Sequence, residues 1–125
     1  MGHVIQNVRL GALKEAEVPL LVDTGATYSL ITPALADRLG VVRLPNKAQV
    51  TLANGQRITA EIGAVQVQIG DRVAPSLAII ADCDEMLLGV EALEALGLAV
   101  DPTSRTLTPT RGYTLRLGGL RANPA

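Results

Sequence analysis

The sequence Pro-Leu-Leu-Val-Asp-Thr-Gly-Ala-Thr-Tyr-Ser-Leu-Ile, residues 19–31, decides how this chain is organised. Its run of Leu and Val predicts a strand buried on both faces, with Asp23 at its end. An ionised carboxylate in apolar surroundings costs free energy unless it is paired, hydrogen-bonded or used in chemistry. Gly25 lets the backbone turn sharply after the acid, and the Thr24 hydroxyl can hydrogen-bond within that turn. The stretch therefore predicts a buried strand that delivers one carboxylate to a tight loop.

A second apolar segment, Met-Leu-Leu-Gly at residues 86–89, precedes a short helical pattern. Together with Val-Asp-Thr-Gly-Ala-Thr at residues 22–27, it resembles the aspartic proteases of the retroviral type, the retropepsin-like family. The resemblance is to the small cellular and prokaryotic single-domain members, and it covers roughly residues 15–108. It implies an all-β, retropepsin-like acid-protease barrel with one or two short helices.

The composition of the chain restricts its fold class, its partners and its possible metal sites. A chain of 125 residues with 48% hydrophobic and 18% charged residues is one folded domain. Its net charge of -1 shows no basic footprint, so nucleic acid is not expected as a partner. The one cysteine, Cys83, excludes an internal disulfide and a Cys-based zinc site, and we expect a buried, inert thiol rather than an intermolecular disulfide.

Membrane and export signals are also missing from the sequence. It contains no apolar run of the length that a transmembrane helix needs. Its N-terminus lacks the basic, apolar and small-residue order of a signal peptide. We therefore expect a cytoplasmic protein with no membrane partner.

The patterns along the chain predict many short strands and two short helices. Thr-Pro before residues 33–39 and Gly40 after them bound the first helix, and Gly97 ends the second, residues 90–96. Strands are expected at residues 3–10, 15–22, 28–31, 41–42, 49–52, 57–60, 64–69, 77–80, 86–88, 98–101, 105–108 and 113–117. This pattern predicts an all-β barrel-like protease domain over residues 1–109, followed by a C-terminal strand or tail over residues 110–125.

Asn54-Gly55 lies between two alternating segments and predicts a hairpin whose two central residues both have positive φ. From the residues alone this is either an ordinary surface hairpin or a functional one. The resemblance identifies Leu52 to Ile58 as the flap that covers the substrate in retropepsin-like domains. It makes Asn54, Gly55 and Gln56 candidate substrate-binding residues.

The chain lacks the residues that most hydrolytic mechanisms need. The only histidine, His3, is close to the N-terminus, which disfavours Ser-His-Asp and Cys-His arrangements. The acidic segment at residues 81–85 lacks calcium-loop spacing and a histidine, so no metal site is expected. Carboxylate chemistry remains. In aspartic proteases it uses two Asp groups about 3 Å apart that share one proton. This chain contains one Asp-Thr-Gly, so the second carboxylate must come from a second copy of the chain.

The resemblance assigns roles within this homodimer. Asp23, Thr24 and Gly25 would be the catalytic residues, with Thr24 bonding across the dimer and Gly25 presenting its backbone to the substrate. Ala26 and Thr27 would contact the substrate, although viral enzymes often have an acid where this chain has Thr27. The substrate would be a peptide or protein bound as an extended strand, and neither a metal nor an organic cofactor is implied.

Two other interpretations remain open. Asp23 can be a structural residue that caps a turn in a domain that has kept the fold without activity, since fold does not imply function. The chain would then be a dimerisation or peptide-binding module. An unrelated β-barrel that binds small ligands would instead need an apolar pocket inside the domain.

Overall fold

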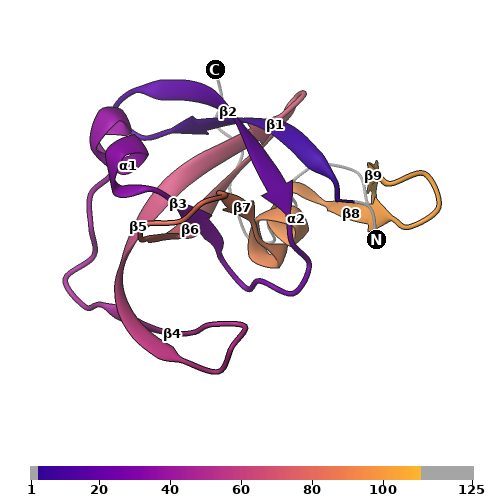
Figure 1. Ribbon diagram of the computed structural model, residues 1–125. Coiled ribbons are helices and arrows are strands. Elements are labelled where there is room, and N and C mark those ends of the chain that lie inside the picture. Colours follow the sequence, from indigo (N-terminus) through magenta and orange to yellow (C-terminus); the bar gives the residue numbers. More distant parts are fainter. Residues whose placement is uncertain (1–2, 111–125) are drawn as a thin grey trace, which may run out of the picture.

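The computed structural model describes residues 3–110 and shows a mainly β domain with two short helices (Figure 1). The elements in chain order are β1 (Ile5–Gly11), β2 (Glu15–Val22), β3 (Ser29–Ile31), α1 (Pro33–Leu39), β4 (Ala48–Thr51), β5 (Arg57–Ile69), β6 (Arg72–Ile80), β7 (Leu87–Leu88), α2 (Val90–Leu96), β8 (Leu98–Asp101) and β9 (Thr106–Pro109).

Seven of these strands form one sheet in the order β1-β2-β7-β3-β6-β5-β4, and β1 also pairs with β5. The extra pairing joins Arg9–Gly11 to Gln66–Gln68 and closes the sheet into a barrel. Strand β7 is only two residues long, yet it runs parallel to β2 and antiparallel to β3. Its insertion between them places Leu88 beside Val22, the residue before Asp23. The all-β, barrel-like prediction is confirmed.

Aliphatic side chains fill the interior of the barrel, as a chain without Phe or Trp requires. The main core joins residues of β1, β2, β5 and β6 to the buried faces of α1 and α2. Its largest fully buried members are Leu10, Leu20, Ile31, Leu39, Leu88, Leu93 and Leu96. A smaller cluster of Ala60, Ile62 and Ile79 lies where β5 leaves the barrel toward β4.

Both helices have the predicted bounds and the predicted caps. The Thr32 Oγ1 accepts a hydrogen bond from the N–H of Leu35 at 3.2 Å, and Pro33 is the first helical residue. Gly40 and Gly97, the residues after the two helices, have φ of +75° and +69°. Helix boundaries could be predicted because these signals are local.

Three strand predictions are corrected. No strand restarts at residues 41–42; the next residue, Arg43, makes a single bridge to Gly63, and Val42 is 76% exposed. The two strands predicted at residues 57–60 and 64–69 are one continuous strand, β5, in which Gly63 makes room for the Val41 side chain. Strand β2 is not buried on both faces: Leu20 is buried, but the next two residues are half-buried. The predicted strand at residues 113–117 lies outside the described residues, and the boundary after residue 109 stays a prediction.

Candidate active site

A tight loop joins β2 to β3 and carries Asp23 at its start (Figure 1). The N–H of Asp23 donates to the carbonyl of Leu88 at 3.0 Å, which continues the pairing of β2 with β7. The carbonyl of Asp23 accepts from the N–H of Ala26 at 3.1 Å and closes the turn. The backbone on both sides of the acid is therefore held by hydrogen bonds.

The carboxylate of Asp23 is oriented by its own loop. Its Oδ1 accepts a hydrogen bond from the N–H of Gly25 at 2.9 Å, the only hydrogen bond of this carboxylate within residues 3–110. A side chain at Gly25 would place its Cβ 3.3 Å from that oxygen, so a small residue suits this position. Asp23 is half-buried, and it is not a member of the ion pairs that join Arg9 to Glu15 and Arg43 to Asp37 and Glu61.

Helix α2 begins directly under this loop. The first N–H groups of a helix have no partner within the helix. Here the N–H of Val90 donates to the carbonyl of Ala26 at 2.8 Å, and that of Glu91 donates to the carbonyl of Thr27 at 3.0 Å. The start of α2 therefore holds the second half of the loop, as β7 holds the first half.

Gly89 lets these two segments approach each other. A Cβ at this position would lie 2.6 Å from the carbonyl oxygen of Tyr28 and 2.9 Å from the nitrogen of Ser29. Real Cβ atoms do not come this close to backbone, so only glycine fits. The Leu-Leu-Gly segment therefore supports the loop in two ways, since Leu88 packs in the core with Val22 and its carbonyl accepts a hydrogen bond from the Asp23 N–H.

Ser29 is the functional candidate that the sequence analysis missed. It is 1% exposed, and its Oγ accepts a hydrogen bond from the N–H of Gly89 at 3.1 Å. The signal was present, since Ser29 is a small polar residue in a segment, residues 28–31, whose other side chains are aromatic or aliphatic. Its partner, however, is 60 residues away in the chain and cannot be found from a local pattern.

Asn54, Gly55 and Gln56 lie at the exposed tip of the hairpin between β4 and β5. Figure 1 shows this hairpin extending from the barrel on the same side as the Asp23 loop. The hairpin is as predicted, but its turn is not, because only Gly55 has positive φ, at +85°. The N–H of Gly55 donates to the carbonyl of Leu52, and that of Leu52 donates to the carbonyl of Gln56, as in a type I turn with a bulged glycine.

A cluster of apolar side chains, rather than hydrogen bonds, connects the β4–β5 hairpin to the segment that follows the Asp23 loop. Tyr28 and Leu30, which follow the loop, pack with Val50 of β4 against the smaller buried cluster of Ala60, Ile62 and Ile79. These side chains are only partly buried. The candidate site residues thus form two groups, Asp23 to Thr27 in the loop and Asn54 to Gln56 at the tip, with apolar side chains between their bases.

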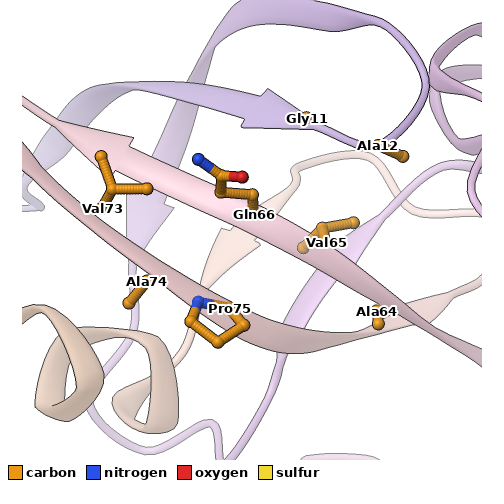
Figure 2. A pocket seen from close by; sticks show the side chains of 8 residues that line it. All are labelled: Gly11, Ala12, Ala64, Val65, Gln66, Val73, Ala74 and Pro75. Carbon is orange, nitrogen blue, oxygen red and sulfur yellow. The ribbon is translucent and has the colours of Figure 1, made fainter. Parts of the chain in front are cut away.

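The surface has one hollow beside the Asp23 loop and another lined by residues outside the candidate site. One, of about 580 Å³, lies beside Thr24 and is lined mainly by apolar residues of α2 and β8, including Leu93, Leu98 and Val100, together with Glu94 and Thr110. The other, of about 430 Å³, lies along β5 and β6 near the end of β1. Figure 2 shows that Gln66 is its one polar side chain. This second hollow therefore has no titratable group to offer a reaction.

The acidic segment around Cys83 has no catalytic arrangement. Burial, and then the charges of Asp82 and Asp84, raise the pKa of the half-buried Cys83 thiol, which favours the unreactive protonated form. Within residues 3–110, no group of three His, Cys, Asp or Glu side chains could hold a metal ion. The same part of the chain has no helix long and apolar enough to cross a membrane.

Comparison with known proteins identifies relatives of the whole arrangement. The family described as gag-polyprotein putative aspartyl protease matches residues 10–95. Protein DDI1 homolog 1 of Homo sapiens is 32% identical over 108 residues, covering 79% of this chain and 27% of the relative. Protein DDI1 homolog 2 of Mus musculus is 33% identical over 89 residues, covering 67% of this chain and 22% of the relative. The chain therefore spans only about a quarter of the length of these curated relatives.

The fold also matches a solved structure, the EIAV protease complexed with the inhibitor HBY-793. The TM-score is 0.61 at 24% sequence identity, and the match covers 77% of this chain and 89% of that chain. At this identity the likeness concerns the fold.

Proposed function

Because this chain belongs to the family of gag-polyprotein putative aspartyl proteases, a retropepsin-like family, we propose that it is an aspartic endopeptidase that acts as a homodimer. Asp23 of each copy supplies one carboxylate of the catalytic pair. The observation that carries the proposal is the loop itself, in which Asp23 has a backbone fixed at both ends and a carboxylate oriented by the Gly25 N–H.

The reaction needs the two carboxylates to share one proton, because like charges about 3 Å apart cannot both be ionised. The ionised Asp23 takes a proton from a water molecule while the water oxygen attacks the carbonyl carbon of the peptide. The protonated Asp23 of the other copy donates a hydrogen bond to the carbonyl oxygen. A proton then passes to the amide nitrogen, the C–N bond breaks, and a carboxylic acid and an amine leave. No metal ion or organic cofactor takes part in these steps.

The second copy would be placed by a two-fold axis between the two Asp23 side chains. Thr24 is exposed in the single chain, next to the mainly apolar hollow between α2 and β8. In the proposed dimer its hydroxyl bonds to the partner loop and locks the two loops together. An apolar surface beside the loop supports such an interface, because burying it on association is favourable.

The substrate would lie as an extended peptide between the loop and the hairpin tip. Gly25, Ala26 and Thr27 would contact it from below, and Asn54, Gly55 and Gln56 would cover it. The partly buried Tyr28, Leu30 and Val50 support a preference for apolar side chains near the cleaved bond.

Digestion of a mixed peptide library, analysed by mass spectrometry between about pH 3 and pH 7, tests this function. The wild type should cleave at defined sites with a preference for mildly acidic pH. Asp23→Asn removes the general base and should lower the rate by at least about 10²–10⁴-fold. Asp84→Asn, which alters an exposed acid outside the loop, is the matched control and should keep full activity.

Mixing the two proteins tests the shared site. If subunits exchange, equal amounts of wild type and Asp23→Asn should lower the activity per wild-type chain to about half, because mixed dimers hold one functional carboxylate. Activity that is independent of the added variant would refute the shared site. A folded wild-type dimer with no cleavage at any pH would favour a non-catalytic peptide-binding module.

A further inference from the structure

Ser29 places a hydroxyl group in the interior, directly behind the Asp23 loop. It begins β3 and is the one buried polar side chain among residues 3–110. Burying a hydroxyl is unfavourable unless it is hydrogen-bonded. The bond that satisfies it comes from the N–H of Gly89, at 3.1 Å.

The peptide unit between Leu88 and Gly89, which supplies this N–H, also holds the backbone of Asp23, the proposed catalytic acid. A peptide unit is planar, and in its trans form the C=O and N–H point in opposite directions. The described residues contain no cis peptide bond. In the unit between Leu88 and Gly89, the C=O accepts from the N–H of Asp23 at 3.0 Å, and the N–H donates to Ser29 Oγ. A rotation of this rigid unit would change both hydrogen bonds together.

Among residues 3–110, the Ser29 hydroxyl is the one group that accepts a hydrogen bond from the N–H end of this unit. Gly89 has no side chain, and α2 has no side-chain hydrogen bond at its N-terminal cap. The next two N–H groups, of Val90 and Glu91, already donate to the loop carbonyls of Ala26 and Thr27. The C=O end of the Leu88–Gly89 unit is therefore held by the Asp23 N–H, and its N–H end is held by Ser29.

We propose that Ser29 is a positioning residue for catalysis. Its hydroxyl fixes the orientation of the Leu88–Gly89 peptide, and through it the backbone and carboxylate of Asp23. The catalytic part of this inference rests on the proposed function, whereas the link between Ser29 and the Asp23 backbone can be tested independently.

Steady-state kinetics of Ser29→Ala test the catalytic part, at a temperature where the variant is fully folded and dimeric. A small displacement of a catalytic group is expensive, so kcat should fall about 10- to 100-fold while KM stays within about threefold. Ser29→Thr keeps the hydroxyl and should retain most of kcat. Ser29→Cys keeps the size with a weaker acceptor and should fall between the two. Ser76→Ala removes a hydroxyl from β6, away from the loop, and should change neither constant.

Amide hydrogen exchange, followed by NMR, tests the link without any activity. The N–H of Asp23 bonds to Leu88, and the N–H of Leu21 bonds to Met86 one step earlier on the same strand, also at 3.0 Å. In Ser29→Ala the exchange of Asp23 should accelerate at least about tenfold relative to that of Leu21. Equal acceleration of the two amides, in a folded protein, would refute the link.

The outcomes separate the two proposals. An unchanged kcat per folded dimer in Ser29→Ala, with only a lower melting temperature, would overturn the positioning role. A wild type that cleaves nothing would overturn the proposed function, and the exchange rates would then still decide whether Ser29 controls the Asp23 backbone.

Discussion

The Asp23 loop and the tip of the β4–β5 hairpin are both short connections between strands, but they are held in opposite ways. The loop and Ser29, the first residue after it, are bonded to residues 60 or more positions away, namely Leu88, Gly89, Val90 and Glu91. The tip is held by bonds within five residues, 52–56, including one from the Gln56 N–H to the Asn54 side chain at 2.9 Å. The loop therefore cannot move unless β7 and α2 move with it, whereas the tip is free to move as a unit.

This difference suits the two proposed roles. A catalytic group must be held within a fraction of an ångström, and sites supported by regular elements are held more precisely than isolated loops. A cover over the substrate must open and close, and such segments come from the least stable parts of a protein. The comparison predicts that substitutions at the long-range contacts of the loop lower the free energy of unfolding most. Substitutions at the local contacts should lower it little.

Gly89→Ala should have the largest effect on stability. The added Cβ would meet the backbone of Tyr28 and Ser29, which cannot yield without moving β3 away from α2. We expect a loss of about 4 kcal/mol or more in the free energy of unfolding, measured by urea denaturation.

Gly11→Ala is the matched control for this change. Its Cβ would meet only the flexible side chain of Glu15, at 3.2 Å, so the free energy of unfolding should stay within about 1 kcal/mol of the wild type. A similar loss of unfolding free energy in both variants would contradict a specific steric requirement for glycine at position 89.

Gly55→Ala should have a smaller effect, confined to the hairpin tip. Nothing lies within 4 Å of the added Cβ, so the cost comes only from the positive φ of +85°. We expect a loss of about 1 kcal/mol, and a smaller one for Gly55→Asn, since asparagine adopts this conformation more readily. Urea denaturation measures the loss, and peptidase kinetics should show the change in KM rather than in kcat. A fall in kcat with unchanged KM would show that the tip positions the catalytic groups.

Substitution of Asp101, in the turn between β8 and β9, should have the smallest effect on the free energy of unfolding. This turn is another connection held by local hydrogen bonds. Hydrogen bonds from the backbone N–H groups of Thr103 and Ser104 hold the pKa of its carboxyl below the ordinary value of 3.8. A lowered pKa in the folded state contributes stability above pH 3.8, and this contribution is lost as the pH falls through the folded pKa.

Comparing the free energy of unfolding of the wild type and Asp101→Asn at several pH values tests this point. The advantage of the wild type should be present near neutral pH and should shrink below the ordinary pKa of 3.8. An advantage that is independent of pH would show that the charge of Asp101 does not stabilise the turn.

Much of the fold could be predicted because its signals are local. Strand β2, both helices and strand β8 have the bounds that the sequence predicts, with Thr32, Gly40 and Gly97 at the helix ends. The family was recognisable from the residues around Asp23 together with the Leu-Leu-Gly segment. The roles of the individual site residues stay predictions.

Two of the errors have different origins, one in a distant contact and one in a local turn. Gly63 looks like a break between two strands, but it allows β5 to continue because Val41 packs against it. Asn54-Gly55 predicts a turn with two positive φ values, but the backbone uses a bulged glycine and the Asn54 side chain accepts a hydrogen bond instead. The first result depends on a residue far away in the chain, whereas the second is an alternative turn made by hydrogen bonds within residues 52–56.

By itself, the sequence determined the aliphatic core, the helix ends and a single carboxylate at the end of a strand, because periodicity, capping and turn chemistry act over a few residues. The tertiary structure alone decided that the two-residue β7 would enter the sheet between β2 and β3. It also decided that Ser29 would meet Gly89 across 60 residues. Such contacts depend on closing long loops and on the space left by the packed barrel, and no local pattern encodes either of them.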